Sequence, residues 1–239
     1  MDFIEVNNNK FLLSVRSTNK PRVSSSIKKG KITITIPNFL NREEKFKEIL
    51  KMKSWAINEI QNDPTRFIEK QKEYKSEDKI KIGEKEYTLS INFENNKGSS
   101  AKIKNNFINL LISKNLSNEE KNNSISTLLS RCIAKDNIKK VKDRIHELNQ
   151  VYFNKKVNNV FLKHNKSNWG SCSTNNNINI STRSLLAPND VLDYIYIHEL
   201  AHLIERNHSE NFWNLIERSM PNYKEKIKWI KQNKENLKF

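Results

Sequence analysis

The segment from His198 to His208 has the residue types and the spacing of a metal site that carries its own base. His198 and His202 are four residues apart, so on a helix they lie about 6 Å apart along the axis and on nearly the same face. Both imidazoles can then bind one zinc ion at about 2.0–2.1 Å. Glu199 lies beside His198, where its carboxylate can accept a proton from an attacking water without binding the metal. The pattern predicts a metal-dependent hydrolase.

His208 is the expected third ligand. On a continuous helix it would lie about 9 Å beyond His202, too far to share an ion with it, so the helix must end between the two. Asn207 tolerates a left-handed backbone and is the predicted end of the helix. The spacing matches the metzincin pattern, but Glu205 stands where that family has glycine, so we expect a different turn.

Two histidines and a glutamate at this spacing also occur by chance, and such histidines are usually ordinary core or surface residues. Here the motif lies on an apolar helix, and a third histidine follows at a spacing that a ligand could use. The motif also takes three of the five histidines in the chain. A zinc site is therefore favoured over a structural role.

Four further motifs around this segment carry a resemblance to a known family. These motifs are Trp169-Gly170-Ser171-Cys172-Ser173, Asp193-Tyr194, Asn207-His208-Ser209 and Phe212-Trp213. With them the chain resembles the YgjP-like zinc metallopeptidase family over roughly residues 10–235, and it is similar to the SprT-like and WLM metalloproteases. The resemblance implies a minimal zincin with one zinc ion per chain on His198, His202 and His208, and Glu199 as the base. Asn168 departs from the pattern, because the resemblance leads us to expect arginine there.

Three aromatic residues are candidates for a supporting role at the site. Tyr194 lies one turn before His198 on the same helical face, from which it could contact that ligand. Tyr223, near the start of the last helix, could donate a hydrogen bond to an oxyanion. Trp169 is expected to pack against the metal-binding helix, with Gly170 allowing a close approach. Each could equally be an ordinary packed side chain.

Two further features concern the substrate. Arg183 could hold a substrate carboxylate or phosphate, or it could form an ion pair with Asp190 or Asp193. The segment 178–182 precedes the motif helix and could be an exposed edge strand that receives an extended substrate by strand addition. An ordinary core strand is the alternative for this segment.

Alternating apolar residues and helix-capping motifs predict an α+β fold. Apolar side chains alternate with polar ones at 32–36 and 87–91, which is typical of half-buried strands. Asn41 with Glu44 forms a capping box, and so does Ser117 with Glu120. We therefore expect an antiparallel β-rich N-terminal half, residues 1–116, with one helix at about 41–62. Residues 117–239 should form a compact, helical, zincin-like catalytic domain with a small sheet.

Composition constrains the location and the partners of the protein. The net charge is +16, but the basic residues are spread along the chain, so a solvated lysine-rich surface is favoured over a nucleic-acid site. Any nucleic-acid binding should be weak and nonspecific. No apolar run could span a bilayer, no signal peptide is evident, and the two cysteines form no recognisable pair. We expect a cytoplasmic protein with no membrane partner.

The leading function is peptide-bond hydrolysis of a protein or peptide substrate by the HExxH-x5-H site, with Glu199 as general base. One alternative is a zinc-dependent nucleoside triphosphate pyrophosphatase on the same site, although the segment 187–217 is locally acidic and phosphates require cations. Another is a protease that acts on DNA-bound proteins. A purely structural zinc module is disfavoured, because no fourth Cys or His ligand is near.

Overall fold

The computed structural model describes residues 2–7, 9–28, 30–63, 67, 72–95 and 98–239. The chain forms two compact units, Met1–Gln71 and Lys72–Phe239. The fold is mixed α+β, with sheet-rich N-terminal regions followed by helices and a small sheet, as the sequence predicts.

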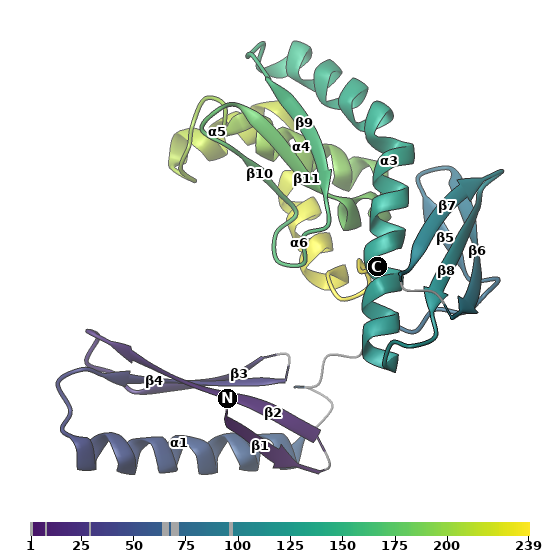
Figure 1. Cartoon of the computed structure of the whole chain (residues 1–239). Helices are drawn as coiled ribbons and strands as arrows, with labels where there is room; N and C mark the ends of the chain where they lie inside the picture. The colour runs from purple at the N-terminus through teal and green to yellow at the C-terminus, as the bar shows by residue number, and fades with distance from the viewer. Residues whose placement is uncertain (1, 8, 29, 64–66, 68–71, 96–97) are drawn as a thin grey trace. The chain divides into compact units, whose positions relative to one another are not determined.

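The first unit is a four-stranded sheet covered on one face by a helix (Figure 1). Its strands are β1 (Asp2–Val6), β2 (Asn9–Thr18), β3 (Ser24–Lys28) and β4 (Lys31–Pro37), in the order β1-β2-β4-β3. The central pair β2–β4 is parallel and the outer pairs are antiparallel, so the sheet is mixed rather than wholly antiparallel. The helix α1 (Arg42–Asn62) starts at the predicted capping box of Asn41 and Glu44, and it buries Ala56 and Ile60.

The second unit begins with another four-stranded sheet, which packs on the long helix α3 (Asn118–Tyr152). Its strands are β5 (Lys79–Ile82), β6 (Lys85–Glu94), β7 (Ser100–Lys104) and β8 (Phe107–Ser113), in the order β5-β6-β8-β7. The capping box of Ser117 and Glu120 starts α3 as predicted. Figure 1 shows α3 running between this sheet and the remainder of the unit.

The two β-sheet modules are copies of one pattern, shifted by 76 residues along the chain. Leu12 pairs with Lys31 in the first, and Thr88 pairs with Phe107 in the second, again through a parallel central pair. The Leu12 N–H donates to the Gly30 carbonyl, and the equivalent Thr88 N–H donates to the Asn106 carbonyl. The capping boxes at 41 and 117 stand at the same shift.

Identical residues also recur 76 positions apart in the two modules, at positions that the shared fold constrains. They include Asp2 and Asp78, Ile4 and Ile80, Leu13 and Leu89, Ile32 and Ile108, Ile36 and Ile112, and Glu44 and Glu120. Most of the hydrophobic members of these pairs are buried, since they face the helix that covers each sheet. The chain therefore contains an internal duplication of a ββββα module.

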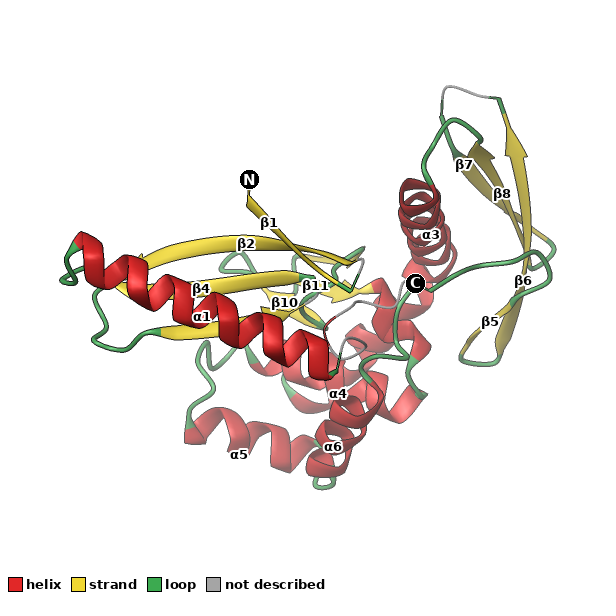
Figure 2. Ribbon diagram, turned by 90° about the horizontal axis from the view of Figure 1, so that it is seen from below, coloured by secondary structure: helices red, strands yellow, loops and turns green. Residues whose placement is uncertain are grey.

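The rest of the second unit is a three-stranded sheet with four helical segments (Figure 2). The strands are β9 (Asn159–Lys163), β10 (Gly170–Cys172) and β11 (Asn177–Ser181), and the order is β10-β11-β9. The helices are η1 (Thr182–Leu186), α4 (Asn189–Ala201), α5 (Glu210–Ser219) and α6 (Tyr223–Asn233). The helix α4 contacts α3, α5, α6 and β10, so it lies at the centre of this half.

The units divide after residue 71, whereas the residue pattern predicts a boundary after residue 116. The β5–β8 sheet joins the second unit because it shares one apolar core with α3. Leu89 and Ile108 of the sheet belong to the same buried cluster as Ile125 and Leu129 of the helix. In the described part of the chain, no helix is long and apolar enough to cross a membrane.

Candidate metal centre

The helix α4 is an apolar helix that fixes two of the three histidines. Ile195, Ile197 and Leu200 are almost fully buried, so packing on most of its sides holds the helix in place. His198 lies in its last turn, and His202 is the residue that caps it. The helix ends at Ala201, well before Asn207.

The early end of α4 corrects the prediction that Asn207 ends the helix. The Ile204 and Glu205 N–H groups both donate to the Ala201 carbonyl, which closes a turn directly after the helix. Asn207 has no left-handed backbone. The chain thus turns before Glu205, and a glycine is not needed at that position.

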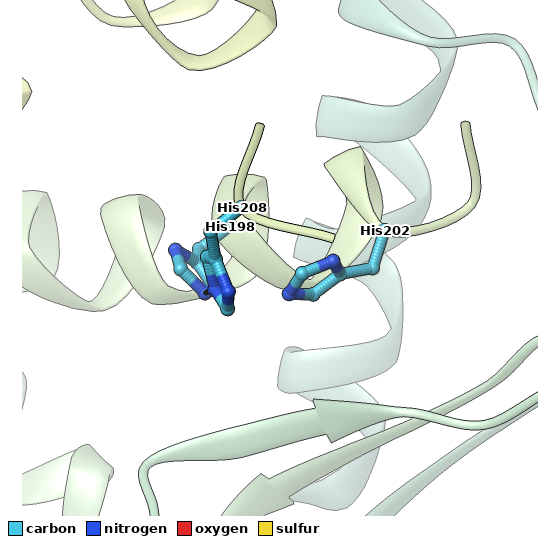
Figure 3. A group of neighbouring side chains, drawn as sticks. All are labelled: His198, His202 and His208. Carbon is cyan, nitrogen blue, oxygen red and sulfur yellow. Dashed lines mark hydrogen bonds between the residues drawn. The ribbon is translucent and has the colours of Figure 1, made fainter. Parts of the chain in front are cut away.

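The three histidines lie together as the sequence predicts (Figure 3). One ligand nitrogen of each lies within 4.8 Å of the others. His198 Nε2 and His208 Nε2 are 3.1 Å apart. The His202 ring lies across from them, with ring centroids 5.1 Å from His198 and 4.8 Å from His208.

Hydrogen bonds and ring packing orient these imidazoles. His202 Nδ1 lies 3.0 Å from the Glu205 carbonyl oxygen, so it carries the proton and leaves Nε2 free to bind a metal. Phe212 of α5 stacks on the His202 ring at a centroid distance of 4.6 Å. The Ser209 side chain caps α5 by accepting from the Phe212 N–H, as predicted from the sequence.

The surroundings of His198 lower the pKa of its imidazole. Burial, together with the neighbouring His202 and His208, lowers the pKa of His198 to about 3. The imidazole is therefore neutral near pH 7, which is the form that binds a metal. The Tyr194 hydroxyl lies 3.5 Å from His198 Nδ1, so the predicted contact between these two residues is present.

Glu199 points away from water and toward the strand β10. The residue is 5% exposed, and burial raises the pKa of its carboxyl group to about 8. Its Oε2 is buried without a hydrogen-bond partner among the described residues. A Cβ atom added to Gly170 would lie only 2.6 Å from Glu199 Oε1, so glycine is required there for the carboxylate to fit.

Tyr223 and Trp169 belong to the walls around the centre. The Tyr223 ring stacks on Trp213 at 5.6 Å, and Trp213 in turn lies 6.0 Å from the His208 ring. Trp169 directly precedes Gly170, and the Arg183 guanidinium lies over its ring at 3.9 Å. Tyr223 thus lies beside Trp213 at the centre, and Trp169 is placed near Glu199 by its chain neighbour Gly170.

The ion pair proposed for Arg183 is wrong, because its two candidate partners are used elsewhere. Asp190 pairs with Lys226 at 2.5 Å, and Asp193 binds Arg144 through two hydrogen bonds of 2.9 and 2.6 Å. Arg183 instead stacks on Trp169, and its buried Nε has no partner among the described residues.

The edge strand beside the centre is β10, which corrects the proposal for 178–182. The strand β11 lies in the middle of its sheet, paired with β10 on one side and β9 on the other. The Ser181 N–H donates to the Trp169 carbonyl, and the Ser173 N–H to the Asn177 carbonyl. By antiparallel alternation, the backbone groups of Gly170 and Cys172 then point to the open edge.

Asn168, where arginine was expected, binds that edge. Its Nδ2 donates to the Gly170 carbonyl at 3.0 Å. Arg206, which no motif singled out, binds the end of the same hairpin through the Ser173 carbonyl at 2.8 Å. Both contacts join residues that only the fold brings together, so spacing could not reveal them.

The donor set fits a zinc ion. Neutral imidazoles are good zinc ligands, and a tetrahedral ion at about 2.0–2.1 Å holds its nitrogen ligands about 3.4 Å apart. The 3.1 Å between His198 Nε2 and His208 Nε2 is close to that spacing. A divalent cation would also give the lone Glu199 carboxylate a nearby positive charge.

A helix in this α+β fold carries two histidines one turn apart, and the loop that follows it adds a third. This arrangement is typical of metal-dependent hydrolases. The family model described as "YgjP-like, metallopeptidase domain" matches residues 22–233, so the chain belongs to the YgjP-like metallopeptidase family. The chain is also similar to the solved structure of the metallopeptidase zymogen abylysin of Pyrococcus abyssi, with 24% sequence identity and a TM-score of 0.36. The match covers 38% of this chain and 93% of abylysin. No curated protein matches the chain.

Proposed function

We propose that the protein is a zinc-dependent peptidase whose site is built from His198, His202, His208 and Glu199. Family membership supports a metallopeptidase, which is a metal-dependent hydrolase. The observation that carries the finer assignment is a buried carboxylate, Glu199, held next to three converging imidazoles. Residues 117–239 remain the proposed catalytic part.

The three imidazoles would hold the zinc ion, which supplies a Lewis acid that polarises the scissile carbonyl. Glu199 is the proposed general base. Burial raises its proton affinity, so it can accept the proton of the attacking water and then give it to the departing amine. Gly170 leaves room for the carboxylate in this position.

The open edge of β10 is the proposed binding place for an extended peptide. The backbone groups of Gly170 and Cys172 point to this edge, and the adjoining Glu199 lies against Gly170. A substrate strand paired here would run beside the base, with main-chain hydrogen bonds supplying affinity.

Secondary roles follow from the contacts. Tyr194 would orient His198 through Nδ1, and Tyr223, stacked beside the centre, would donate to the developing oxyanion. Arg183 on Trp169 is proposed to bind a substrate carboxylate through its buried Nε, which has no hydrogen-bond partner among the described residues.

Phosphoanhydride hydrolysis needs cations beside the metal, and Arg206, on the loop that carries His208, already donates to Ser173 and Asn176. Peptide hydrolysis is therefore preferred, and phosphate release from nucleoside triphosphates is the alternative outcome of the same assay. A cytoplasmic location is proposed on the two free cysteines.

The test is metal content followed by hydrolysis. We expect about one zinc per chain in the wild type, and His202→Ala should lose most of it while the far-ultraviolet circular dichroism stays unchanged, because the apolar core does not include the metal. Cleavage of an unfolded protein should disappear with the zinc. A His202→Ala protein that keeps its zinc would disprove the ligand assignment.

A further inference from the structure

The loop between α4 and α5 contributes twice to the candidate metal centre. The carbonyl of Glu205 fixes the tautomer of His202, and His208 supplies the third imidazole. Both contributions depend on where the loop backbone lies. Asn207 and His208 are exposed, so burial does not fix that backbone.

The backbone of this loop has few anchors of its own. The N–H groups of Leu203, Ile204 and Glu205 bond back to the end of α4. Within the described residues, the N–H and carbonyl groups of 206–208 make no backbone hydrogen bond outside helices and strands. The anchor of this stretch is therefore a side chain.

That side chain is Arg206, which reaches the β10–β11 hairpin with both terminal nitrogens. Its Nη1 donates to the Ser173 carbonyl at 2.8 Å and lies 3.4 Å from Cys172 Sγ. Its Nη2 donates to Asn176 Oδ1 at 2.7 Å. Asn176 has φ +53° and so occupies the tight turn of the hairpin.

We propose that Arg206 is a positioning residue of the metal centre, which ties the ligand-bearing loop to the hairpin and thereby sets the affinity for zinc. This inference rests on the proposed function, because it assumes that the three histidines bind the ion. Since the same hairpin carries Gly170 against Glu199, the contact also aligns the base with the ligands.

Charge and position predict opposite effects when Arg206 is removed. A guanidinium repels a divalent cation, and it already helps to lower the pKa of His202, after burial and His208. If only charge mattered, an uncharged residue would tighten zinc binding. If position matters, the loop is released and binding weakens, by about tenfold on the scale of outer-shell contacts at metal sites.

The experiment measures the zinc dissociation constant by competition with a chromophoric chelator, in wild type, Arg206→Gln and Arg206→Lys. Gln removes the charge, whereas Lys keeps it but cannot reach both Ser173 and Asn176 in the fork geometry. We expect both variants to bind zinc about tenfold more weakly. Arg218→Gln, which removes an exposed arginine on α5, is the matched control and should stay within about twofold of the wild type.

Two further measurements separate positioning from a general loss of stability. The thermal midpoint of the metal-free protein should fall no more in Arg206→Gln than in the Arg218→Gln control. In a His208→Ala background, Arg206→Gln should have a smaller effect on the remaining zinc affinity, because its main target is gone.

The outcomes are distinct. Unchanged or tighter zinc binding in Arg206→Gln overturns the inference and leaves the three-histidine site intact. So does wild-type affinity in Arg206→Lys. A wild type that binds no zinc disproves the proposed function, and the inference with it.

Discussion

His198 and Glu199 are neighbours in sequence, and burial shifts their proton affinities in opposite directions. The pKa of His198 falls to about 3 and that of Glu199 rises to about 8, because both groups lose the water that favours their charged forms. The histidine is thus kept neutral for a metal, and the glutamate has a high affinity for a proton. A bound divalent cation would lower the Glu199 value toward its usual range.

Replacing Glu199 by Gln distinguishes a base from a ligand. Gln keeps the shape but cannot accept a proton, so zinc should stay bound while the hydrolytic rate falls by about 10²–10⁴. Zinc content and rate are measured on one preparation. Loss of zinc would make Glu199 a ligand, and full activity with zinc bound would assign the base elsewhere.

Gly170→Ala should displace Glu199 without removing a ligand. The added Cβ would lie 2.6–2.8 Å from three atoms of the Glu199 side chain, and the buried carboxylate must move. We expect turnover to fall at least tenfold with zinc content unchanged. Gly98→Ala, where a Cβ meets nothing within 4 Å, is the control. Normal turnover in Gly170→Ala would show that the position of the carboxylate is not critical.

Local spacing predicts the site residues only where the chemistry is local. His198, Glu199 and His202 lie within one helical turn, so a sequence pattern suffices to bring them together. Gly170 and Arg206 act on residues about thirty positions away, through β10 and the hairpin. Such contacts depend on packing, which a single sequence does not display.

At the level of elements, the short strand β10 contributes to the candidate site in three ways. Its face supports Glu199 at Gly170, one of its edges pairs with β11, and the other edge carries the outward groups of Gly170 and Cys172. The sequence singles out the longer apolar segment 178–182 for that edge, because periodicity reports burial but not strand order. The central place of β11 explains that it is the more apolar strand.

Asn168 tests whether β10 receives the substrate. Its side chain occupies the Gly170 carbonyl, so Asn168→Ala should free an acceptor for an incoming strand. We expect KM for a long peptide to fall about threefold, a change of under 1 kcal/mol, with kcat unaltered. A dipeptide substrate, too short to pair along the strand, serves as the control. Unchanged KM for the long peptide would argue against strand addition at this edge.

At the level of the whole molecule, charge is spread over both units and is not gathered at the centre. The chain carries +16, yet the acidic residues Asp190 and Asp193 lie near the start of α4 and are already paired with Lys226 and Arg144. Dispersed lysines bind phosphates without reading bases.

Duplex DNA should therefore bind weakly and lose affinity steeply with salt. We expect fluorescence anisotropy of a labelled duplex to show binding near 0.05 M salt that is lost by about 0.3 M, with no preference among sequences. Tight binding that persists above about 0.3 M salt would instead indicate a dedicated nucleic-acid site and would favour a protease for DNA-bound proteins.

The sequence predicts the α+β class and the two capping boxes, but not the duplication. The hydrophobic alternation that repeats after 76 residues is shared by most half-buried strands, and the identities are scattered among polar changes. The pairing registers make the equivalence plain, because Leu12–Lys31 and Thr88–Phe107 are fixed by backbone geometry.

Two like modules in one chain create a hazard during folding, since a strand of one could pair within the other and trap a misassembled chain. Phe11 and Tyr87 stand at equivalent places, but the Tyr87 hydroxyl donates to Asp136 and accepts from Asn137, both on α3. If β2 took the place of β6, Asp136 and Asn137 would each lose the hydrogen bond to the Tyr87 hydroxyl, and Asn137 would keep its bond to the Ile133 carbonyl. The cost is about 1 kcal/mol for each hydrogen bond lost. The Tyr87 hydroxyl thus favours β6 over β2 beside α3.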